Sequence, residues 1–265
     1  MTSKKILGRV SALWRYPVKS MAGEELNRCE ITPRGLLGDR AYALVDEATG
    51  LIGSAKNPRA WPDLLSYRAA FVETPQVGKP LPPVRIAMPG GQDIDLATAF
   101  GRRVGLSASP PEQPILEQFW PVLDATGEER VTNERMPPSS FFDLAVVNVL
   151  LTTTLDRLAA AYPQGRFDMR RFRPNIVITP EPTATADPEA AVVGQTLCLG
   201  DAVRLHVDSR CARCVMTTLA HGGMTKDTDI LRTVIRANDG FVGLNSSVAQ
   251  AGVIAVGDRV WFTDS

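Results

Sequence analysis

The spacing of apolar residues is the feature that most constrains the fold. Over the first 105 residues, short segments of alternating apolar and polar residues are separated by glycine and proline. An alternation of period two places every second side chain on one face, as in a half-buried β-strand. The sequence therefore predicts strands over residues 8–18, 27–35, 39–50, 67–73 and 84–96.

The second half of the chain also favours strands, with two helices between them. We expect strands over residues 174–179, 201–207, 214–219 and 252–262, and helices over 152–162 and 228–238. A threonine can cap the first helix, and Pro163 ends it. A Gly-Asp pair opens a strand at Gly38, Gly200 and Gly257, which favours a barrel or a strongly bent sheet over a parallel α/β fold.

Length and composition describe an ordinary globular chain. Its 265 residues suffice for one large domain or two modest ones, and the proline-rich stretch 107–114 is the better candidate for a boundary. We therefore expect an N-terminal domain over residues 1–110 and a second domain over 111–265. Lysine plus arginine equals aspartate plus glutamate, 29 each, so overall charge offers no argument for a nucleic-acid or membrane partner.

The expected location is the cytoplasm. The N-terminal stretch "MTSKKILGRVSALWRYPVKS" has too short an apolar run for a signal peptide, and no segment approaches the ~18 apolar residues of a membrane span. Cys29 and Cys198 stand alone in the sequence, so we expect reduced thiols packed in the core.

Cys211 and Cys214 form the most informative pair, and the residues alone leave three interpretations open. A structural zinc site needs four ligands, but a second cysteine pair is missing and His206 and His221 lack finger-like spacing. A redox dithiol usually opens a helix, whereas β-branched residues follow here and Arg213 is the one cation between the two cysteines. The third interpretation is a pair of buried core thiols.

Basic residues cluster in "RFDMRRFRPN", residues 166–175, as Arg166, Arg170, Arg171 and Arg173. Such a cluster is either a solvated face or a site that binds a phosphate through bidentate guanidinium groups.

Six short motifs occur in one order along almost the whole chain. They are "YPVKS" (16–20), "GLLGDRAYALVD" (35–46), "FFD" (141–143), "RFRPNIVI" (171–178), "CARCVMTT" (211–218) and "GVIAVGDRV" (252–260). Together they resemble the MOSC proteins in their two-part form, the family of YcbX-type bacterial proteins and of the mitochondrial amidoxime-reducing component. The resemblance implies a strand-rich α+β protein, with an N-terminal β-barrel-like domain and a MOSC β-barrel core carrying a few short helices.

The resemblance also implies a molybdenum cofactor, with Cys214 as the thiolate ligand of the metal and Cys211 in a supporting role. The cofactor contacts it implies are Lys19, Ser20, Arg40, Arg171, Arg173, Asn175 and Asn245. Asp143 matches an acidic residue near the metal, where it would handle protons; its other interpretation is a helix or turn cap. One departure is "FVGLN" (241–245), where Gly243 and Asn245 align with the family only if one residue is inserted.

The implied activity is the two-electron reduction of an N-hydroxylated or N-oxide small molecule by removal of oxygen at the Cys-ligated molybdenum. The chain has neither the length nor the cysteines for an added iron–sulfur domain, so electrons are expected from a separate donor protein such as a ferredoxin, a flavin reductase or a cytochrome. Two alternatives stay open: a sulfur carrier that uses a Cys214 persulfide, and a non-catalytic carrier of the molybdenum cofactor.

Overall fold

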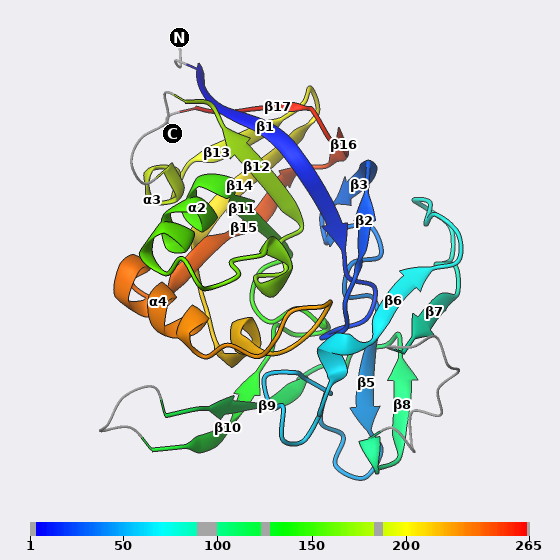
Figure 1. Ribbon diagram of the computed structural model, residues 1–265. Helices are drawn as coiled ribbons and strands as arrows, with labels where there is room; N and C mark the ends of the chain where they lie inside the picture. The colour runs from blue at the N-terminus through cyan, green and yellow to red at the C-terminus, as the bar shows by residue number, and fades with distance from the viewer. Residues whose placement is uncertain (1–3, 89–99, 123–127, 183–187, 264–265) are drawn as a thin grey trace.

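A closed β-barrel dominates the computed structural model, which describes residues 4–88, 100–122, 128–182 and 188–263 (Figure 1). Seven strands form it in the order β12-β11-β15-β14-β13-β17-β1, and a second pairing between β1 and β12 closes the ring. The strands are β1 (Lys4–Arg15), β11 (Val147–Leu151), β12 (Ile176–Pro180), β13 (Thr196–Leu199), β14 (Val203–Ala212), β15 (Phe241–Gln250) and β17 (Arg259–Thr263). Neighbours are antiparallel except β11 and β12, which are parallel.

The barrel interior follows from the alternation in the sequence. Val203, Leu205 and Val207 are fully buried in it, while His206 between them is exposed, as their spacing predicted. The first strand belongs to this barrel although it lies far away in sequence, because β1 pairs with both β12 and β17. Two helices, α2 (Thr152–Ala161) and α4 (Asp229–Asn238), pack outside the barrel around a second apolar cluster.

The remaining N-terminal residues form smaller sheets beside the barrel. β5 (Ala43–Asp46) pairs with β8 (Val104–Ser107), β6 (Arg68–Phe71) with β7 (Val84–Ala87), and β9 (Ile115–Trp120) with β10 (Arg130–Arg135). β3 (Arg28–Thr32) lies between β4 (Gly35–Leu36) and β16 (Gly252–Ala255), while β2 (Glu24–Leu26) extends the barrel sheet beside β1. The predicted strand-rich α+β class with a few short helices is confirmed.

Most of the expected elements are present, the strand expected over 252–262 is divided into β16 and β17, and two other expectations are wrong. Residues 214–219 are not a strand, because Val215–Thr218 form the 3₁₀ helix η3, in which the Thr217 and Thr218 hydroxyls donate to the carbonyls of Cys214 and Val215. No threonine side chain caps α2, which begins directly after the extended residue Leu151. The part of the expected strand 84–96 beyond residue 88 lies outside the described residues.

The other short elements connect the strands. They are η1 (Leu64–Ser66), η2 (Met169–Arg171) and α3 (Pro188–Ala191). In the part of the chain that the structure describes, no helix combines the length and apolar character needed to cross a membrane.

Candidate active site

A cavity of about 420 Å³ lies where the barrel meets the N-terminal sheets. All nine site residues expected from the sequence line it: Lys19, Ser20, Arg40, Asp143, Arg171, Arg173, Asn175, Cys214 and Asn245. They come from segments more than 200 residues apart, so this cavity exists only when both halves of the chain are folded.

Cys214 faces this cavity from the segment between β14 and η3. It is extended, with φ −130° and ψ −173°, so no helical turn begins at the residue itself. The neighbouring Arg213 donates to the carbonyls of Val242 at 2.7 Å and Phe172 at 2.8 Å, and to Oδ1 of Asn148 at 3.1 Å. These bonds hold Arg213 against the barrel. They therefore fix the backbone at the next residue, Cys214, whose thiol faces the cavity.

The thiols fall into two classes. Cys29 and Cys198 are buried in the core, as predicted, whereas Cys211 and Cys214 are half-buried and line the cavity. All four are free thiols. Among the described residues, no group of three or more His, Cys, Asp and Glu side chains could hold a metal ion, so a structural zinc site is not formed there. Cys211 and Cys214 are therefore not core thiols but cavity thiols.

Asp143 lies between two lysines. Lys19 Nζ donates to Oδ1 of Asp143 at 2.5 Å and to the carbonyl of Phe141 at 3.0 Å, and Lys56 Nζ lies 3.5 Å from the other carboxylate oxygen. Burial lowers the pKa of Lys19 to about 8, against the opposing effect of Asp143. Burial would raise the pKa of Asp143, but the two ammonium groups outweigh it and hold that pKa well below its usual range. Asp143 is thus ionised at neutral pH.

Two guanidinium groups share one aromatic ring. Arg40 and Arg173 lie 4.6 and 4.2 Å from the centroid of the Tyr16 ring. Arg40 also pairs with the buried carboxylate of Asp39, which accepts from the backbone N–H of Tyr16. Arg173 donates to the carbonyl of Met21 at 2.7 Å, and burial lowers its pKa to about 10. Both cations are held in place before any ligand binds.

Three of the six described non-glycine residues with positive φ angles lie in the same region. Ser20, Arg40 and Arg173 have positive φ angles of 63°, 45° and 53°, in the left-handed region that non-glycine residues seldom occupy. Such strain persists only where surrounding contacts over-determine it, and it clusters at ligand-binding sites. All three residues line the cavity.

The other expected site residues are bonded to the protein itself. Arg171 donates to the carbonyls of Arg166, Thr217, Leu219 and Thr225, so the N–H groups of its guanidinium are largely bonded within the protein. Asn175 Oδ1 accepts from the N–H of Asn148, and Asn245 Nδ2 donates to the hydroxyl of Ser209. Ser20 Oγ accepts from the N–H of Ala55. These side chains fix the cavity wall.

Burial raises the pKa of Cys214, and the Lys56 ammonium is the main charge that opposes this effect. Lys56 was not among the expected site residues, because it lies in an irregular loop that shows no apolar periodicity. Gln118, Trp120 and Arg213 line the cavity as well. Arg213 stands inside the Cys-x-x-Cys pair, and that position was the one available sequence signal for it.

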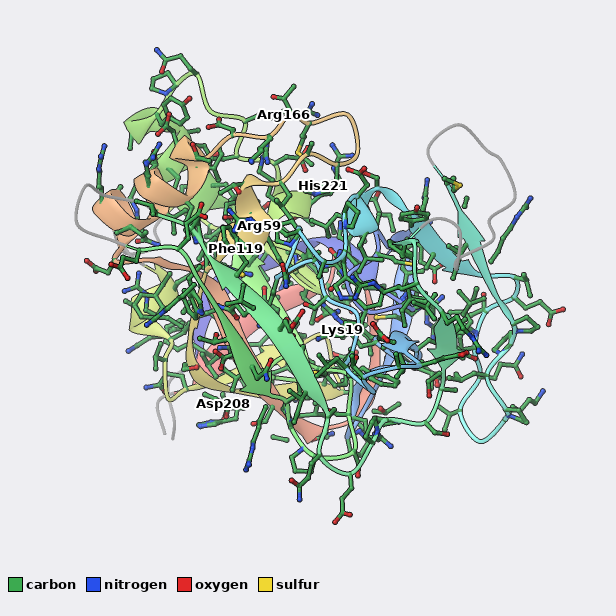
Figure 2. The ribbon with its side chains drawn as sticks, turned by 90° about the horizontal axis from the view of Figure 1, so that it is seen from below. Lys19, Arg59, Phe119, Arg166, Asp208 and His221 are labelled. Atoms are coloured by element: carbon green, nitrogen blue, oxygen red, sulfur yellow. The ribbon has the colours of Figure 1, made fainter. Side chains whose placement is uncertain are left out.

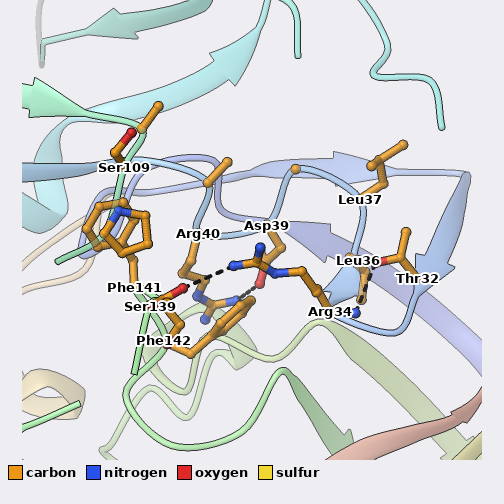
Figure 3. A pocket seen from close by; sticks show the side chains of 15 residues that line it. Thr32, Arg34, Leu36, Leu37, Asp39, Arg40, Ser109, Ser139, Phe141 and Phe142 are labelled. Atoms are coloured by element: carbon orange, nitrogen blue, oxygen red, sulfur yellow. Dashed lines mark hydrogen bonds and ion pairs between the residues drawn. The ribbon is translucent and has the colours of Figure 1, made fainter. Parts of the chain in front are cut away.

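A second cavity of about 460 Å³ lies behind the same wall (Figure 3). Arg40, Phe141 and Phe142 line both cavities, so they form the partition between them. In the second cavity Arg34 donates to the carbonyl of Ser139, as the dashed line in Figure 3 shows.

Comparison with known proteins places this architecture in a family. Residues 7–104 match the family model described as the MOSC N-terminal beta barrel domain, and residues 138–261 match the MOSC domain. The chain is a two-part MOSC protein. The matched segments contain all nine expected site residues: Lys19, Ser20 and Arg40 lie in the N-terminal domain, and the other six, Asp143 included, lie in the MOSC domain.

Named relatives of this MOSC protein are distant. It is 23% identical over 290 residues to mitochondrial amidoxime reducing component 2 of Rattus norvegicus, covering 96% of this chain and 83% of the relative. It is 26% identical to mitochondrial amidoxime-reducing component 1 of Mus musculus, covering 80% of this chain but 66% of the relative. The crystal structure of the YuaD protein from Bacillus subtilis covers 100% of both chains with a TM-score of 0.50 at 11% identity, which shows a shared fold.

The cavity of the MOSC protein suits an anionic cofactor bound through sulfur. Among the described lining residues, six basic side chains (Lys19, Arg40, Lys56, Arg171, Arg173 and Arg213) face a single acidic one, Asp143. Two thiols, Cys211 and Cys214, line the cavity without a second ligand pair, and a single thiolate from them fits a metal whose other sulfurs come from the cofactor. The donor set therefore fits a molybdenum cofactor of the kind for which the MOSC domain is named.

Proposed function

We propose that this MOSC protein is a molybdenum-cofactor-dependent oxidoreductase that reduces N-hydroxylated or N-oxide small molecules. The observation that carries the proposal is Cys214, a half-buried free thiol that lines a cavity together with six basic side chains. The names of the relatives, which are amidoxime-reducing components, support the same chemistry.

Each set of residues has a distinct role in holding the cofactor. Cys214 would bind the metal as a thiolate, while Arg40, Arg173 and Lys19 would face the phosphate end. When bound, the cofactor would supply the two-electron redox chemistry. Asn175 and Asn245 keep the neighbouring backbone in position through the bonds described above.

Protons come from the Lys19–Asp143–Lys56 group. Reduction of an N–OH group to N–H consumes two electrons and two protons and releases water. Lys19, whose pKa is about 8, is protonated at neutral pH yet is a better donor than an ordinary lysine. Asp143 accepts the hydrogen bond from Lys19 and lies 3.5 Å from Lys56, so its carboxylate holds both ammonium groups in position at the cavity.

Electrons would come from a separate donor protein, and the substrate would be a small molecule that enters the cavity. Neither nucleic acid nor a membrane is part of the proposal, because the net charge of the chain is zero and gives no argument for either partner. The cytoplasmic location expected from the sequence stays a prediction.

The test is the molybdenum content of purified protein after expression in a host that makes the pterin cofactor. The wild type and Cys211→Ser should each hold about one molybdenum per chain, whereas Cys214→Ser should hold almost none, since thiolate is the protein ligand in this scheme. Cys211→Ser is a matched control because Cys211 lines the same cavity. Equal molybdenum in the wild type and Cys214→Ser would contradict the proposal.

Two outcomes would favour the other functions. A wild type that holds no molybdenum but gains the mass of one sulfur atom on Cys214 would indicate a persulfide carrier. Tight molybdenum binding without turnover, when a reductant and N-hydroxylated compounds are supplied, would indicate a non-catalytic carrier of the cofactor.

A further inference from the structure

The β9–β10 hairpin contributes to the cavity from outside both family matches, which end at residue 104 and resume at residue 138. Its strands pair from Ile115 with Arg135 to Trp120 with Arg130. Figure 2 shows the hairpin crossing the near side of the molecule, with the labelled Phe119 and Arg59 close together. An element that the family models do not describe thus borders the site that they share.

The hairpin is firmly attached to the loop that carries Lys56. The N–H of Phe119 donates to the carbonyl of Lys56 at 2.8 Å, and the Asn57 amide donates to the Glu117 carboxylate at 3.0 Å. The N–H of Ile52 donates to the carbonyl of Ile115 at 2.9 Å. Because these contacts hold the hairpin along its length, the side chains on its inner face have defined positions.

Alternation along β9 decides which side chains those are. Leu116, Gln118 and Trp120 share one face. Leu116 is buried in an apolar cluster, and the next two line the cavity. On the opposite face Phe119 is covered by Arg59, whose guanidinium lies 4.2 Å from the ring centroid. The inner face therefore runs from the core to the cavity.

Gln118 is unusual on this face. The residue is 6% exposed, its side-chain amide bonds to none of the described residues, and the amide is not one of the fully buried unpartnered atoms, so it faces the cavity. Buried polar groups are nearly always bonded, and an amide carries two donor hydrogens and an acceptor oxygen. The amide therefore has its full bonding capacity available to a molecule in the cavity.

Trp120 differs from Gln118 because its polar atom is already bonded within the protein. Its indole N–H already donates to the hydroxyl of Thr132 at 2.8 Å, and that hydroxyl donates to the Glu134 carboxylate at 2.6 Å. Arg130, its partner across the hairpin, lies 5.4 Å from the ring centroid. With its polar atom bonded within the hairpin, the ring offers the cavity an apolar surface held in one orientation.

We propose that Gln118 and Trp120 form a subsite for the body of the substrate. The Gln118 amide bonds to a polar atom beside the N–O group, and the Trp120 ring packs against a planar aromatic body. This inference rests on the proposed function, and it makes the hairpin the part of this chain that selects among N-hydroxylated compounds.

Steady-state kinetics on the molybdenum-loaded enzyme test the subsite with benzamidoxime, an aromatic amidoxime, and acetamidoxime, its aliphatic counterpart. Trp120→Leu should raise KM for benzamidoxime about ten-fold and leave KM for acetamidoxime unchanged. Gln118→Leu should raise KM for both about ten-fold. In each variant kcat should stay within about two-fold and the molybdenum content should match the wild type, because neither side chain binds the cofactor in this scheme.

Matched controls separate the subsite from general damage. Trp261→Phe changes a tryptophan on β17 that does not line the cavity, and Val131→Thr changes an exposed residue of the same hairpin. Trp120→Phe keeps an aromatic ring should Trp120→Leu fold poorly, and it should retain part of the preference for benzamidoxime. Unchanged KM values in Gln118→Leu and Trp120→Leu at full molybdenum content would overturn the inference.

A binding measurement keeps this inference distinct from the proposed function. Titration of the purified protein with benzamidoxime should change the tryptophan fluorescence of the wild type and of Trp261→Phe, and Trp120→Leu should lose most of that change. If the wild type neither holds molybdenum nor reduces amidoximes but binds benzamidoxime through Trp120, the proposed function fails and the subsite stands. If neither the fluorescence nor KM depends on residues 118 and 120, the subsite fails.

Discussion

The barrel interior and the cavity beside it are built from the same strands, yet they have opposite chemistry. Leu244 on β15 is fully buried among the aliphatic side chains of the barrel, and the next residue, Asn245, lines the cavity. On β12 Ile176 lies in the same apolar cluster, whereas Arg173 and Asn175 just before it line the cavity. The cavity residue of β15 lies within the strand, and those beside β12 lie just before it begins, so the strands that form the core also position the polar groups.

The two regions also differ in how the burial of their side chains affects the stability of the fold. Burial of aliphatic groups in the barrel stabilises the fold by roughly 25 cal/mol per Å². Buried charges such as Lys19 and Arg173 lose hydration, and their partners only offset that loss. Replacements in the barrel should therefore lower stability, while replacements in the cavity should mainly affect ligand binding.

The largest effect on stability is expected from Leu205→Ala in the barrel. Leu205 is fully buried, so truncation should lower the free energy of unfolding by about 3 kcal/mol through lost burial and the cavity left behind. Leu144→Ala is the matched control, because Leu144 is 67% exposed at the cavity, and it should change stability by less than about 0.5 kcal/mol. Urea unfolding of both variants measures the difference; equal losses would break the contrast between the two regions.

The contrast between the barrel and the cavity also explains which parts of the structure could be predicted from the sequence. The alternation at Val203, Leu205 and Val207 is a local pattern, so the strand and its inner face could be predicted from it. The same reasoning failed at residues 214–219, where threonine hydroxyls bond to the preceding carbonyls and override β propensity. It also missed β15, in which Asn245 and Ser246 are buried and interrupt the apolar pattern.

The site residues also divide into those that the sequence predicted and those that it did not. The family motifs, rather than local periodicity, indicated the expected residues, and all nine of them line one cavity. Lys56 and Gln118 reach that cavity from a loop and a hairpin, and their arrival depends on contacts between distant segments, such as the bond from the Phe119 N–H to the Lys56 carbonyl. No pattern within either segment predicts such a contact.

Arg213→Lys should have the next largest effect, since Arg213 links the cavity to the barrel. Lysine cannot reproduce the three bonds to Val242, Phe172 and Asn148, so buried acceptors lose their donors and stability should fall by about 2 kcal/mol. The molybdenum content should fall as well, because Cys214 follows directly. Arg204→Lys is the control, as Arg204 bonds to carbonyls of its own strand and turn. A loss no greater than that of Arg204→Lys would contradict the linking role.

Lys19 should make stability depend on pH in a direction opposite to that of an ordinary ion pair. Its pKa is about 8 in the folded protein, compared with an ordinary value of 10.5. Between these values the unfolded chain binds more protons, so the free energy of unfolding of the wild type should rise with pH relative to Lys19→Met. The expected slope is about 1 kcal/mol per pH unit, measured by urea unfolding at a series of alkaline pH values. Parallel curves for the two proteins would show that Lys19 has a normal pKa.

The smallest effect on stability is expected from Lys56→Met. Lys56 is paired with a carboxylate that is 42% exposed, so removal of the charge should change stability by less than about 1 kcal/mol. Activity should nevertheless fall by about ten-fold or more, because Asp143 loses one of the two ammonium groups that keep it ionised and hydrogen-bonded. Lys56→Arg keeps the positive charge and should restore most of the activity. If the activity of Lys56→Arg were as low as that of Lys56→Met, the cavity would require the shape of the lysine side chain rather than its charge. The contrast between an apolar barrel and an electrostatic site would then not hold at this residue.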